Sequence, residues 1–351
     1  LIVAGARRVE IGALTVGTVA AFLQLVRRFF DPLQDLSDKY NMLQQAMAAS
    51  ERIFRLLDTP VAPGTSALAV IEGGPRLTSQ KVTVEFHDVW FAYDIAHVAR
   101  ASTTGEHSPE WILKGVSFRA EPGQTIALVG HTGAGKTTIV NLLLRFYDPQ
   151  RGRITVNGVD IREMAVDELR SLIGYVQQDI FLFAGDITTN IRLSNPLTDD
   201  QVSTAAARVG ADRIIRHFPD GYSHILGERG ASISVGERQL LSFARAIAAD
   251  PSLLILDEAT SAVDSEIEAE IQSALAVLMS GRTTIAIAHR LSTIVGADEI
   301  LVLHHGQVRE RGTHRQLMAK AGLYERLYRL QTGVANGNER VPGTSALVSG
   351  I

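Results

Sequence analysis

A glycine-rich segment that ends in lysine and threonine has the spacing of a phosphate-binding loop. It reads Gly130-His-Thr-Gly133-Ala-Gly135-Lys136-Thr137 and fits the pattern Gly-x4-Gly-Lys-Thr, between an apolar run and a helical segment. Glycines let successive backbone N–H groups point toward a β-phosphate, and the following helix adds its positive N-terminal dipole. The lysine can reach the β- and γ-phosphate oxygens, and the threonine hydroxyl can ligate Mg²⁺. The segment predicts phosphate contacts from Gly130, Thr132, Gly133, Ala134, Gly135, Lys136, Thr137 and Thr138.

Two adjacent carboxylates, Asp257 and Glu258, follow the apolar run 253–256. Strand alternation sends adjacent side chains in different directions, so the two carboxylates need different roles. Asp257 is suited to hold Mg²⁺ through water, and Glu258 is suited to polarise an attacking water as general base. The alternative is a solvated acidic turn, which the preceding buried run disfavours.

Two further polar residues follow apolar, strand-like runs. His289 comes after 284–288, where a histidine can contact a γ-phosphate and hold the attacking geometry. Gln178 comes shortly after 173–176, where its amide can contact both Mg²⁺ and the attacking water. By itself each signal is weak, because most histidines are structural.

The elements that must position these groups have a mixed α/β pattern from Lys81 onward. Alternating apolar residues predict a strand at 82–86. Short apolar runs typical of buried strands lie at 125–129, 253–256 and 284–288. Helical segments are expected between them, at 136–146, 235–249 and 265–279. Residues 94–110 predict an exposed loop insertion, and the segment after Gln331 predicts a flexible tail.

Composition excludes several classes of protein. The chain has 351 residues, of which 46% are apolar and 21% charged, so wholesale disorder and complete membrane embedding are both ruled out. Its formal net charge of −4 argues against a protein that coats nucleic acid, and we expect no nucleic-acid partner. Because there is no cysteine, disulfide scaffolds, cysteine-ligated zinc, iron–sulfur clusters and thiol catalysis are excluded.

The first 30 residues differ from the rest. The run from Ile11 to Val26 has no formal charge, and Phe29 and Phe30 extend its apolar character toward the length of a membrane span. A buried globular helix is the alternative. Residues 1–6 would end an earlier span and 7–12 would form a tight turn. Because the chain begins with Leu1 inside an apolar run, we expect a fragment of a longer protein.

A long helix is expected after this run. Apolar residues spaced three and four apart from Leu33 to Leu57 form a heptad seam, in which Ser50 is the one polar residue. Pro32 permits a bend there without ending the helix. The functional interpretation is a rod between a membrane span and the soluble domain, and the alternative is an amphipathic helix packed on its own domain. Prolines and glycines in 59–80 then predict a linker.

Together these residues resemble the ATP-binding-cassette (ABC) family. The family's signature, a Leu-Ser-Gly-Gly-Gln-like stretch that opens a helix, is similar to Ile233-Ser-Val-Gly-Glu237. Its order before Asp257-Glu258 and Asp264 separates this family from kinases and GTPases. The resemblance also extends upstream to the last transmembrane helix of exporters that fuse permease and ATPase. It implies a transmembrane part at 1–58, a linker at 59–80, an α/β ATPase domain with a mixed sheet and helical subdomain at 81–331, and a tail at 332–351.

The resemblance implies further roles residue by residue. Tyr93 corresponds to the aromatic residue that stacks on adenine, although a core tyrosine is the alternative. Ser234 and Gly236, with Glu237 in the same segment, would contact the γ-phosphate of ATP held by the opposite subunit. Asp264 would lie at the dimer seam. The segment 227–230 is similar to one that contacts coupling helices in exporters.

Two departures from the signature affect the expected partner. Val235 stands in place of a glycine and adds bulk where backbone approaches phosphate. Glu237 stands in place of a glutamine and adds negative charge there. We therefore predict an unequal pair with a second half-transporter, with a homodimer as the simpler alternative.

The resemblance implies an ATP- and Mg²⁺-dependent exporter subunit in the cell membrane, with its ATPase domain cytoplasmic. ATP would bind between two head-to-tail cassettes, and the cargo would be an unidentified small molecule, hydrophobic or lipid by analogy. A soluble cassette ATPase, an importer ATPase and a regulator without turnover are the alternatives. The single cassette, the apolar run 11–26 and Glu258 favour the exporter.

Overall fold

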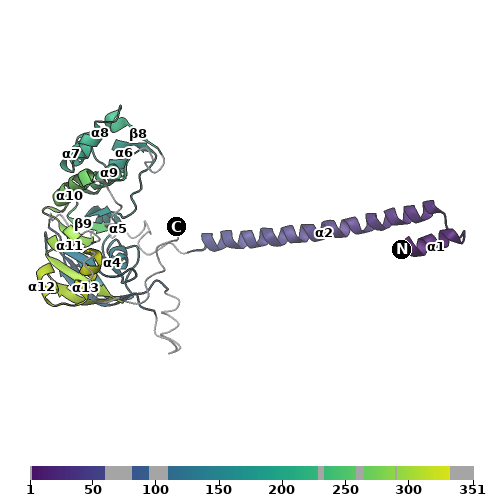
Figure 1. Cartoon of the computed structure of the whole chain (residues 1–351), viewed down its shortest axis with the longest axis horizontal. Coiled ribbons are helices and arrows are strands. Elements are labelled where there is room, and N and C mark those ends of the chain that lie inside the picture. Colours follow the sequence, from purple (N-terminus) through teal and green to yellow (C-terminus); the bar gives the residue numbers. More distant parts are fainter. Residues whose placement is uncertain are drawn as a thin grey trace. The chain divides into compact units, whose positions relative to one another are not determined.

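The computed structural model describes residues 2–59, 81–94, 110–227, 233–257, 265–288 and 291–332. The predicted linker, loop insertion and tail fall largely outside these ranges. The chain divides into two compact units, Leu1–Val61 and Ala62–Ile351, which are described separately (Figure 1).

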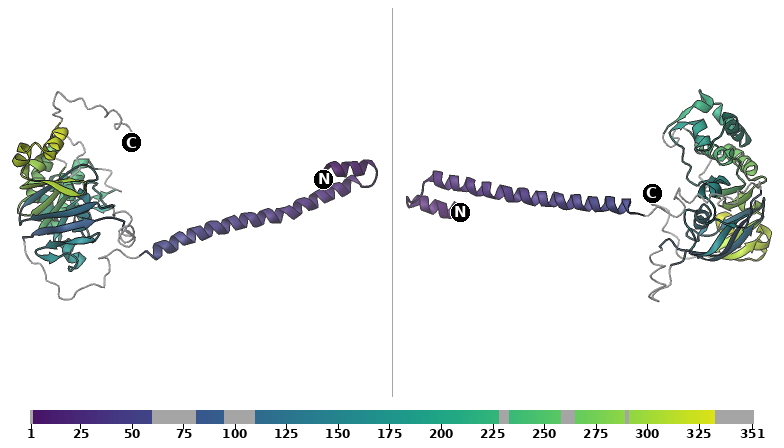
Figure 2. Two further views of the ribbon diagram at one scale, coloured as in Figure 1. Left: turned by 90° about the horizontal axis from the view of Figure 1, so that it is seen from below. Right: turned by 180° about the vertical axis from the view of Figure 1, so that it is seen from behind.

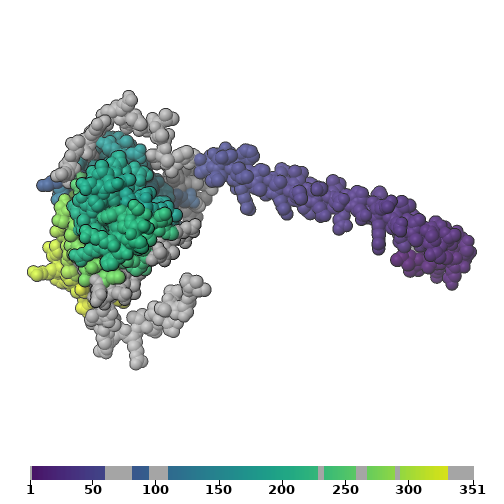
Figure 3. Space-filling model, turned by 90° about the horizontal axis from the view of Figure 1, so that it is seen from above, coloured from purple at the N-terminus to yellow at the C-terminus, as the bar shows by residue number. Residues whose placement is uncertain are grey.

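The first unit is a helical hairpin. Helix α1 spans Ile2–Glu10 and helix α2 spans Val16–Leu57. Thr15 caps α2 by accepting a hydrogen bond from the Thr18 N–H at 3.2 Å, and α2 continues through Pro32 as expected. Figure 3 shows α1 lying against the N-terminal end of α2. The turn lies after Glu10, later than the predicted 7–12, because α1 continues past Arg7.

The apolar run near the N-terminus is interrupted in the structure. None of the helices that the structure describes is long and apolar enough to cross a membrane. Helix α2 begins at Val16, within the run 11–26, and contains Arg27 and Arg28.

A mixed six-stranded sheet is the centre of the second unit. Its strand order is β12-β11-β3-β10-β9-β6, parallel except for β12 at one edge. The strands are β3 Thr125–Val129, β6 Ile173–Val176, β9 Leu253–Asp257, β10 Thr283–Ile287, β11 Glu299–His304 and β12 Gln307–Gly312. β3, β9 and β10 are completely buried, because their apolar side chains are covered on both faces. The α/β class and the predicted strands are confirmed.

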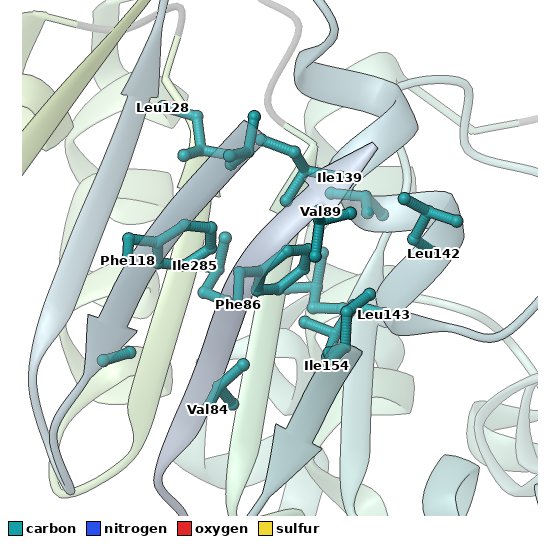
Figure 4. Close-up of a cluster of buried hydrophobic side chains, with 14 of the residues drawn as sticks. Val84, Phe86, Val89, Phe118, Leu128, Ile139, Leu142, Leu143, Ile154 and Ile285 are labelled. Carbon is teal, nitrogen blue, oxygen red and sulfur yellow. The ribbon is translucent and has the colours of Figure 1, made fainter. Parts of the chain in front are cut away.

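A second, antiparallel sheet packs on this centre. Its order is β2-β1-β4-β5, with β1 Val84–Phe91, β2 Leu113–Ala120, β4 Arg151–Val156 and β5 Val159–Asp160. Phe86 and Phe118 stack with ring centroids 4.5 Å apart. Figure 4 shows side chains of this sheet, of helix α4 (Lys136–Leu143) and of the large sheet gathered in one apolar cluster. This packing fixes the start of α4 beside β2. Helix α5 (Val166–Ser171) precedes β6.

A helical part carries a second apolar cluster that packs against β6, β9 and β10. Figure 1 and the right-hand view of Figure 2 show α6, α7 and α8 grouped at one end of this unit. Its elements are β7 Gly185–Asp186, α6 Ile187–Arg192, α7 Asp199–Arg208, α8 Ala211–Ile215, η1 Gly221–Ser223, β8 Ile225–Leu226, α9 Val235–Ala248 and α10 Ser265–Met279. A mixed sheet with a helical subdomain is therefore confirmed.

The C-terminal helices cover part of the large sheet. Helices α11 Leu291–Gly296, α12 His314–Ala319 and α13 Leu323–Thr332 surround a smaller apolar cluster that includes Leu317 and Tyr324. The Tyr324 hydroxyl lies 2.7 Å from His314 Nδ1, and burial raises the pKa of Tyr324 to about 12. This cluster supports the β3–β11 side of the sheet, where the phosphate loop begins.

Candidate functional site

The carboxyl ends of four parallel strands meet at one edge of the large sheet. Leu128 on β3 pairs with Ile287 on β10, and Ile287 pairs with Asp257 on β9. On the other side of β9, Leu256 pairs with Val176 on β6. The loops that leave these strands therefore begin side by side, which is where ligands bind in such sheets.

The segment after β3 forms a tight loop that leads directly into α4. Gly133 and Gly135 have φ angles of +80° and +104°, in the left-handed region that favours glycine. A Cβ on Gly130 would lie 2.4 Å from the Leu303 carbonyl oxygen, and one on Gly135 would lie 2.6 Å from Leu113 Cδ2. The glycines are therefore required both by the backbone conformation and by close packing.

Lys136 is the first residue of α4 and is only 9% exposed. Its Nζ donates to the carbonyl oxygens of Gly130 at 2.7 Å and His131 at 3.0 Å. Burial lowers the pKa of Lys136, while the negative charge of Asp257 acts in the opposite direction. The ammonium group thus lies within the curve of the loop.

The rest of the loop divides into two faces. Thr132, Gly133 and Thr137 are exposed, whereas Ala134, Gly135 and Thr138 are buried. The exposed residues are available to a ligand, and the buried ones hold the loop in place.

Asp257 ends β9 and is 8% exposed. Its charge influences both Lys136 and Tyr175: burial is the larger cause that raises the pKa of Tyr175, and Asp257 adds to it. Gln178 is exposed and lies two residues beyond Val176 at the same edge. The register therefore brings the ends of β3, β6 and β9 to one edge of the sheet. This is required if the phosphate loop, Gln178 and Asp257 are to serve one site, as predicted.

Tyr93 lies beside the start of α4. Its hydroxyl is 3.2 Å from Thr138 Oγ1 and accepts a hydrogen bond from Asn141 Nδ2 at 3.3 Å. Its ring meets Tyr147 edge-on at 5.1 Å and is 45% exposed. Tyr93 is therefore oriented next to the phosphate loop rather than buried in the core. The sequence interpretation missed Asn141 and Tyr147, whose only signal is their position in and just after this helix.

Ser234 and Glu237 cap the N-terminus of α9. Ser234 Oγ accepts from the Glu237 N–H at 3.2 Å, and the Ser234 N–H donates to Glu237 Oε2 at 2.7 Å. This reciprocal capping box satisfies two backbone donors that a helix N-terminus otherwise leaves unpaired. Gly236 is buried, and Val235 is 39% exposed. The Ser-x-x-Glu spacing that signals such a cap was readable in the sequence and was overlooked.

Residues 113–261 match the protein family described as ABC transporter. This chain carries an ATP-binding domain of the ABC transporter family. The match includes the phosphate loop, Asp257 and the capped segment at Ser234.

Curated proteins similar to this chain match it over most of its length. The chain is 45% identical over 328 residues to the fatty acid ABC transporter ATP-binding/permease protein of Mycobacterium tuberculosis, covering 93% of this chain and 49% of that protein. It is 42% identical over 317 residues to the ATP-dependent lipid A-core flippase of Burkholderia thailandensis, covering 90% of this chain and 50% of that protein. The chain spans about half the length of the curated relatives it matches.

A solved structure supports the same assignment. The chain aligns with a bacterial Atm1-family ABC exporter with ATP bound, at a TM-score of 0.69 and 36% identity, over 93% of this chain and 54% of that one. The predicted ABC-type fold is therefore confirmed.

Several expected ABC site residues lie outside the described residues. Glu258, Asp264 and His289 belong to this group, as do residues 228–230 of the segment expected to contact coupling helices. Their roles stay predictions. Two of these residues directly follow described residues at the sheet edge. Glu258 follows Asp257, and His289 follows Ala288.

The capping role of Glu237 leads to a testable prediction for this ABC signature. Two other capping boxes in the chain use glutamine, Gln201 with Thr198 and Gln316 with Thr313. We therefore expect Glu237→Gln to keep the cap while removing a negative charge. If this segment contacts phosphate as predicted, the change lowers the KM for ATP by up to about fivefold, the effect of roughly 1 kcal/mol. We expect Glu237→Ala to lose about 1 kcal/mol of stability, because the Ser234 N–H loses its acceptor.

Thermal unfolding and steady-state ATPase measurements on both variants check this prediction. The alanine variant is the control for the cap, because it removes the charge and the hydrogen bond together. A higher KM in Glu237→Gln at unchanged stability would contradict the repulsion.

Proposed function

We propose that this chain is the ATP-hydrolysing part of an ABC exporter subunit and that its cassette closes head-to-tail with a second cassette. The observation that carries the proposal is the buried ammonium group of Lys136 inside the glycine loop, at the same sheet edge as Asp257. The relatives' names favour an exporter over a soluble ATPase.

The phosphate-binding residues act through hydrogen bonds and charge. The loop N–H groups and the N-terminus of α4 receive the β-phosphate. Lys136 exchanges its contacts with the Gly130 and His131 carbonyls for phosphate oxygens. Tyr93 offers an exposed ring for stacking on adenine and is held by its bond to Thr138.

The donor set at the sheet edge fits Mg²⁺. Thr137, Asp257 and Gln178 offer hydroxyl, carboxylate and amide oxygens, the hard ligands that Mg²⁺ prefers, and Mg²⁺ is commonly held by one or two carboxylates plus substrate phosphates. Accordingly, no group of three or more His, Asp or Glu among the described residues could hold a metal ion by itself. Bound there, Mg²⁺ neutralises charge on the phosphate oxygens.

The hydrolytic step is assigned to residues beyond the described strand ends. Glu258 accepts a proton from the attacking water, and His289 contacts the γ-phosphate and holds the geometry. Gln178 orients the water and reports the nucleotide state. Each role follows from the position of the residue one or two places after a strand whose end lies at the nucleotide site.

The second cassette supplies the signature. Ser234 and Gly236 of this chain contact ATP held by the partner, and the partner's signature contacts ATP held here. Because Val235 and Glu237 weaken this chain's signature, we favour an unequal pair over a homodimer. Asp264 lies at the seam between the cassettes.

The helical hairpin links ATP hydrolysis to transport. The apolar seam of α2 is exposed along its length in the described unit, with Leu36 66% and Met47 64% exposed. Such a surface is expected to pack against other helices of a membrane domain. The cargo class that fits the relatives' names is a lipid or another hydrophobic molecule. The location is the cell membrane, with the ATPase domain in the cytoplasm.

ATPase measurements test the proposal. The protein that contains this chain is purified alone and with candidate half-transporter partners, and Mg²⁺-dependent ATP hydrolysis is measured. We expect a clear increase in turnover on pairing, because the partner completes the site with a better signature. Full turnover by the protein alone would reject the unequal pair, and absence of hydrolysis in every combination would reject the proposed function.

A further inference from the structure

One arginine of the signature helix is bonded to the loop that carries Gln178. Arg245 lies in the last turn of α9. Its Nε donates to the Asn190 carbonyl oxygen at 2.8 Å, one terminal nitrogen donates to the Phe181 carbonyl oxygen at 2.9 Å, and the other donates to Asn190 Oδ1 at 3.2 Å. The guanidinium group thus joins α9 to two segments more than fifty residues away in sequence.

Asn190 continues this connection into the same loop. Asn190 is 1% exposed. Its Oδ1 accepts from the Phe183 N–H at 2.8 Å, and its Nδ2 donates to the Phe183 carbonyl oxygen at 2.9 Å and to that of Asp186 at 3.1 Å. Arg245 and Asn190 therefore hold both ends of the peptide stretch from Phe181 to Phe183.

Hydrogen bonds and one buried side chain position this loop: Leu182 is fully buried in the second apolar cluster, and Ile180 packs against that cluster. Residues 177–184 contain no helix or strand, and Phe181 and Phe183 are 45% and 50% exposed. A surface cavity of ≈ 380 Å³ lies beside the loop and is lined by both phenylalanines and by Arg245. Because one side of the loop is hollow, loss of the arginine bonds leaves the Phe181 carbonyl without its side-chain partner, and the loop is then held by Leu182 and by the Asn190 bonds to Phe183.

The charge of Arg245 faces uncharged acceptors. Among the described residues no carboxylate forms an ion pair with it, and burial lowers its pKa. The planar guanidinium group directs several N–H donors in fixed directions, so it can hold the three carbonyl and amide oxygens at once. The single ammonium group of lysine cannot reproduce this arrangement.

The other end of α9 carries Ser234 as its N-cap. α9 is packed in the second apolar cluster, so its two ends move together. We propose that Arg245 is a positioning residue that holds the Gln178 loop to the helix bearing Ser234, so that the state of the nucleotide in this chain's site is passed to the site that this chain's signature completes. This inference rests on the proposed function, because it assumes two nucleotide sites shared by a cassette pair.

Hydrogen exchange and kinetics of the protein that contains this chain, with its partner, test the proposal. Arg245→Met removes the charge and the fork, and Arg245→Lys keeps the charge alone. In Arg245→Met we expect about tenfold faster exchange of amides in 177–186 and about a tenfold lower kcat, with an unchanged Kd for ATP. Arg245→Lys is expected to lie between this variant and the wild type.

The control variant is Arg208→Met, on neighbouring helix α7, whose exposed guanidinium lies 3.6 Å from Asp250. It is expected to leave exchange of 177–186 and kcat unchanged. Unchanged exchange and kcat in Arg245→Met would overturn the proposal. Faster exchange throughout the domain would also overturn it, since the arginine would then be merely structural. If Arg245→Met does not fold, exchange of 177–186 and kcat are measured on Arg245→Lys instead, and they decide the proposal.

The exchange experiment separates this proposal from the proposed function. If the wild-type protein does not hydrolyse ATP, the proposed function fails. Passage of the nucleotide state between two sites then fails with it, and exchange tests only the positioning role of Arg245: a rise confined to 177–186 supports that role, and no rise overturns it.

Discussion

Replacement of Lys136 by methionine is expected to weaken ATP binding by roughly a hundredfold, the effect of losing about 3 kcal/mol when one member of a buried charge pair is removed. The ammonium group is almost fully buried and lies within the curve of the phosphate loop, where no other described cation contacts the loop carbonyls of Gly130 and His131. Methionine has similar length but no charge. Equilibrium binding of ATP, measured by calorimetry or a fluorescent analogue, checks the result.

The control for this prediction is Lys320→Met. Lys320 is exposed at the C-cap of α12, so its replacement is expected to leave the Kd for ATP unchanged. Lys136→Met also leaves the two loop carbonyls without their lysine donor, which costs about 1 kcal/mol each, so thermal unfolding is measured for both variants. A wild-type Kd in folded Lys136→Met would remove this residue from the site.

Replacement of Glu258 by glutamine is expected to lower ATP turnover by about 10²–10⁴-fold while ATP binding is retained. Glu258 directly follows Asp257, whose strand ends at the nucleotide edge of the sheet. Because adjacent residues of a strand point in different directions, Glu258 can serve the water while Asp257 serves the metal. Single-turnover hydrolysis and ATP binding, measured on the same preparation, separate the two effects.

A matched control is Glu163→Gln, which makes the same chemical change at an exposed position outside the site. Its turnover is expected to equal that of the wild type. If Glu258→Gln hydrolyses ATP at the normal rate, Glu258 is not the general base, and the assignment of roles after β9 and β10 must be revised.

The strands at the centre of the domain were predictable because their signal is local. Runs of apolar residues at 125–129, 253–256 and 284–288 are buried on both faces, and each became a strand within one residue of its expected limits. The predicted helix at 265–279 has those bounds in the structure as well.

Element ends were less predictable. The helix expected at 136–146 ends at Leu143, because Arg145 adopts a φ of +51° that a helix cannot continue through. At the N-terminus, the first residues of the apolar run 11–26 precede α2, which begins at Val16. Composition over a window does not show where a helix begins.

The sequence alone determined the phosphate loop, the carboxylate of Asp257 at the end of β9 and the capped start of α9, because each depends on residues within one turn or one strand. The tertiary structure decided which loops meet: the register places Asp257 level with Leu128 through Ile287, and the fold brings Tyr93 to Thr138 and Arg245 to Phe181. These pairs lie 45 and 64 residues apart in the chain. Such contacts depend on how whole elements pack against one another, and no pattern in a short stretch of sequence specifies that.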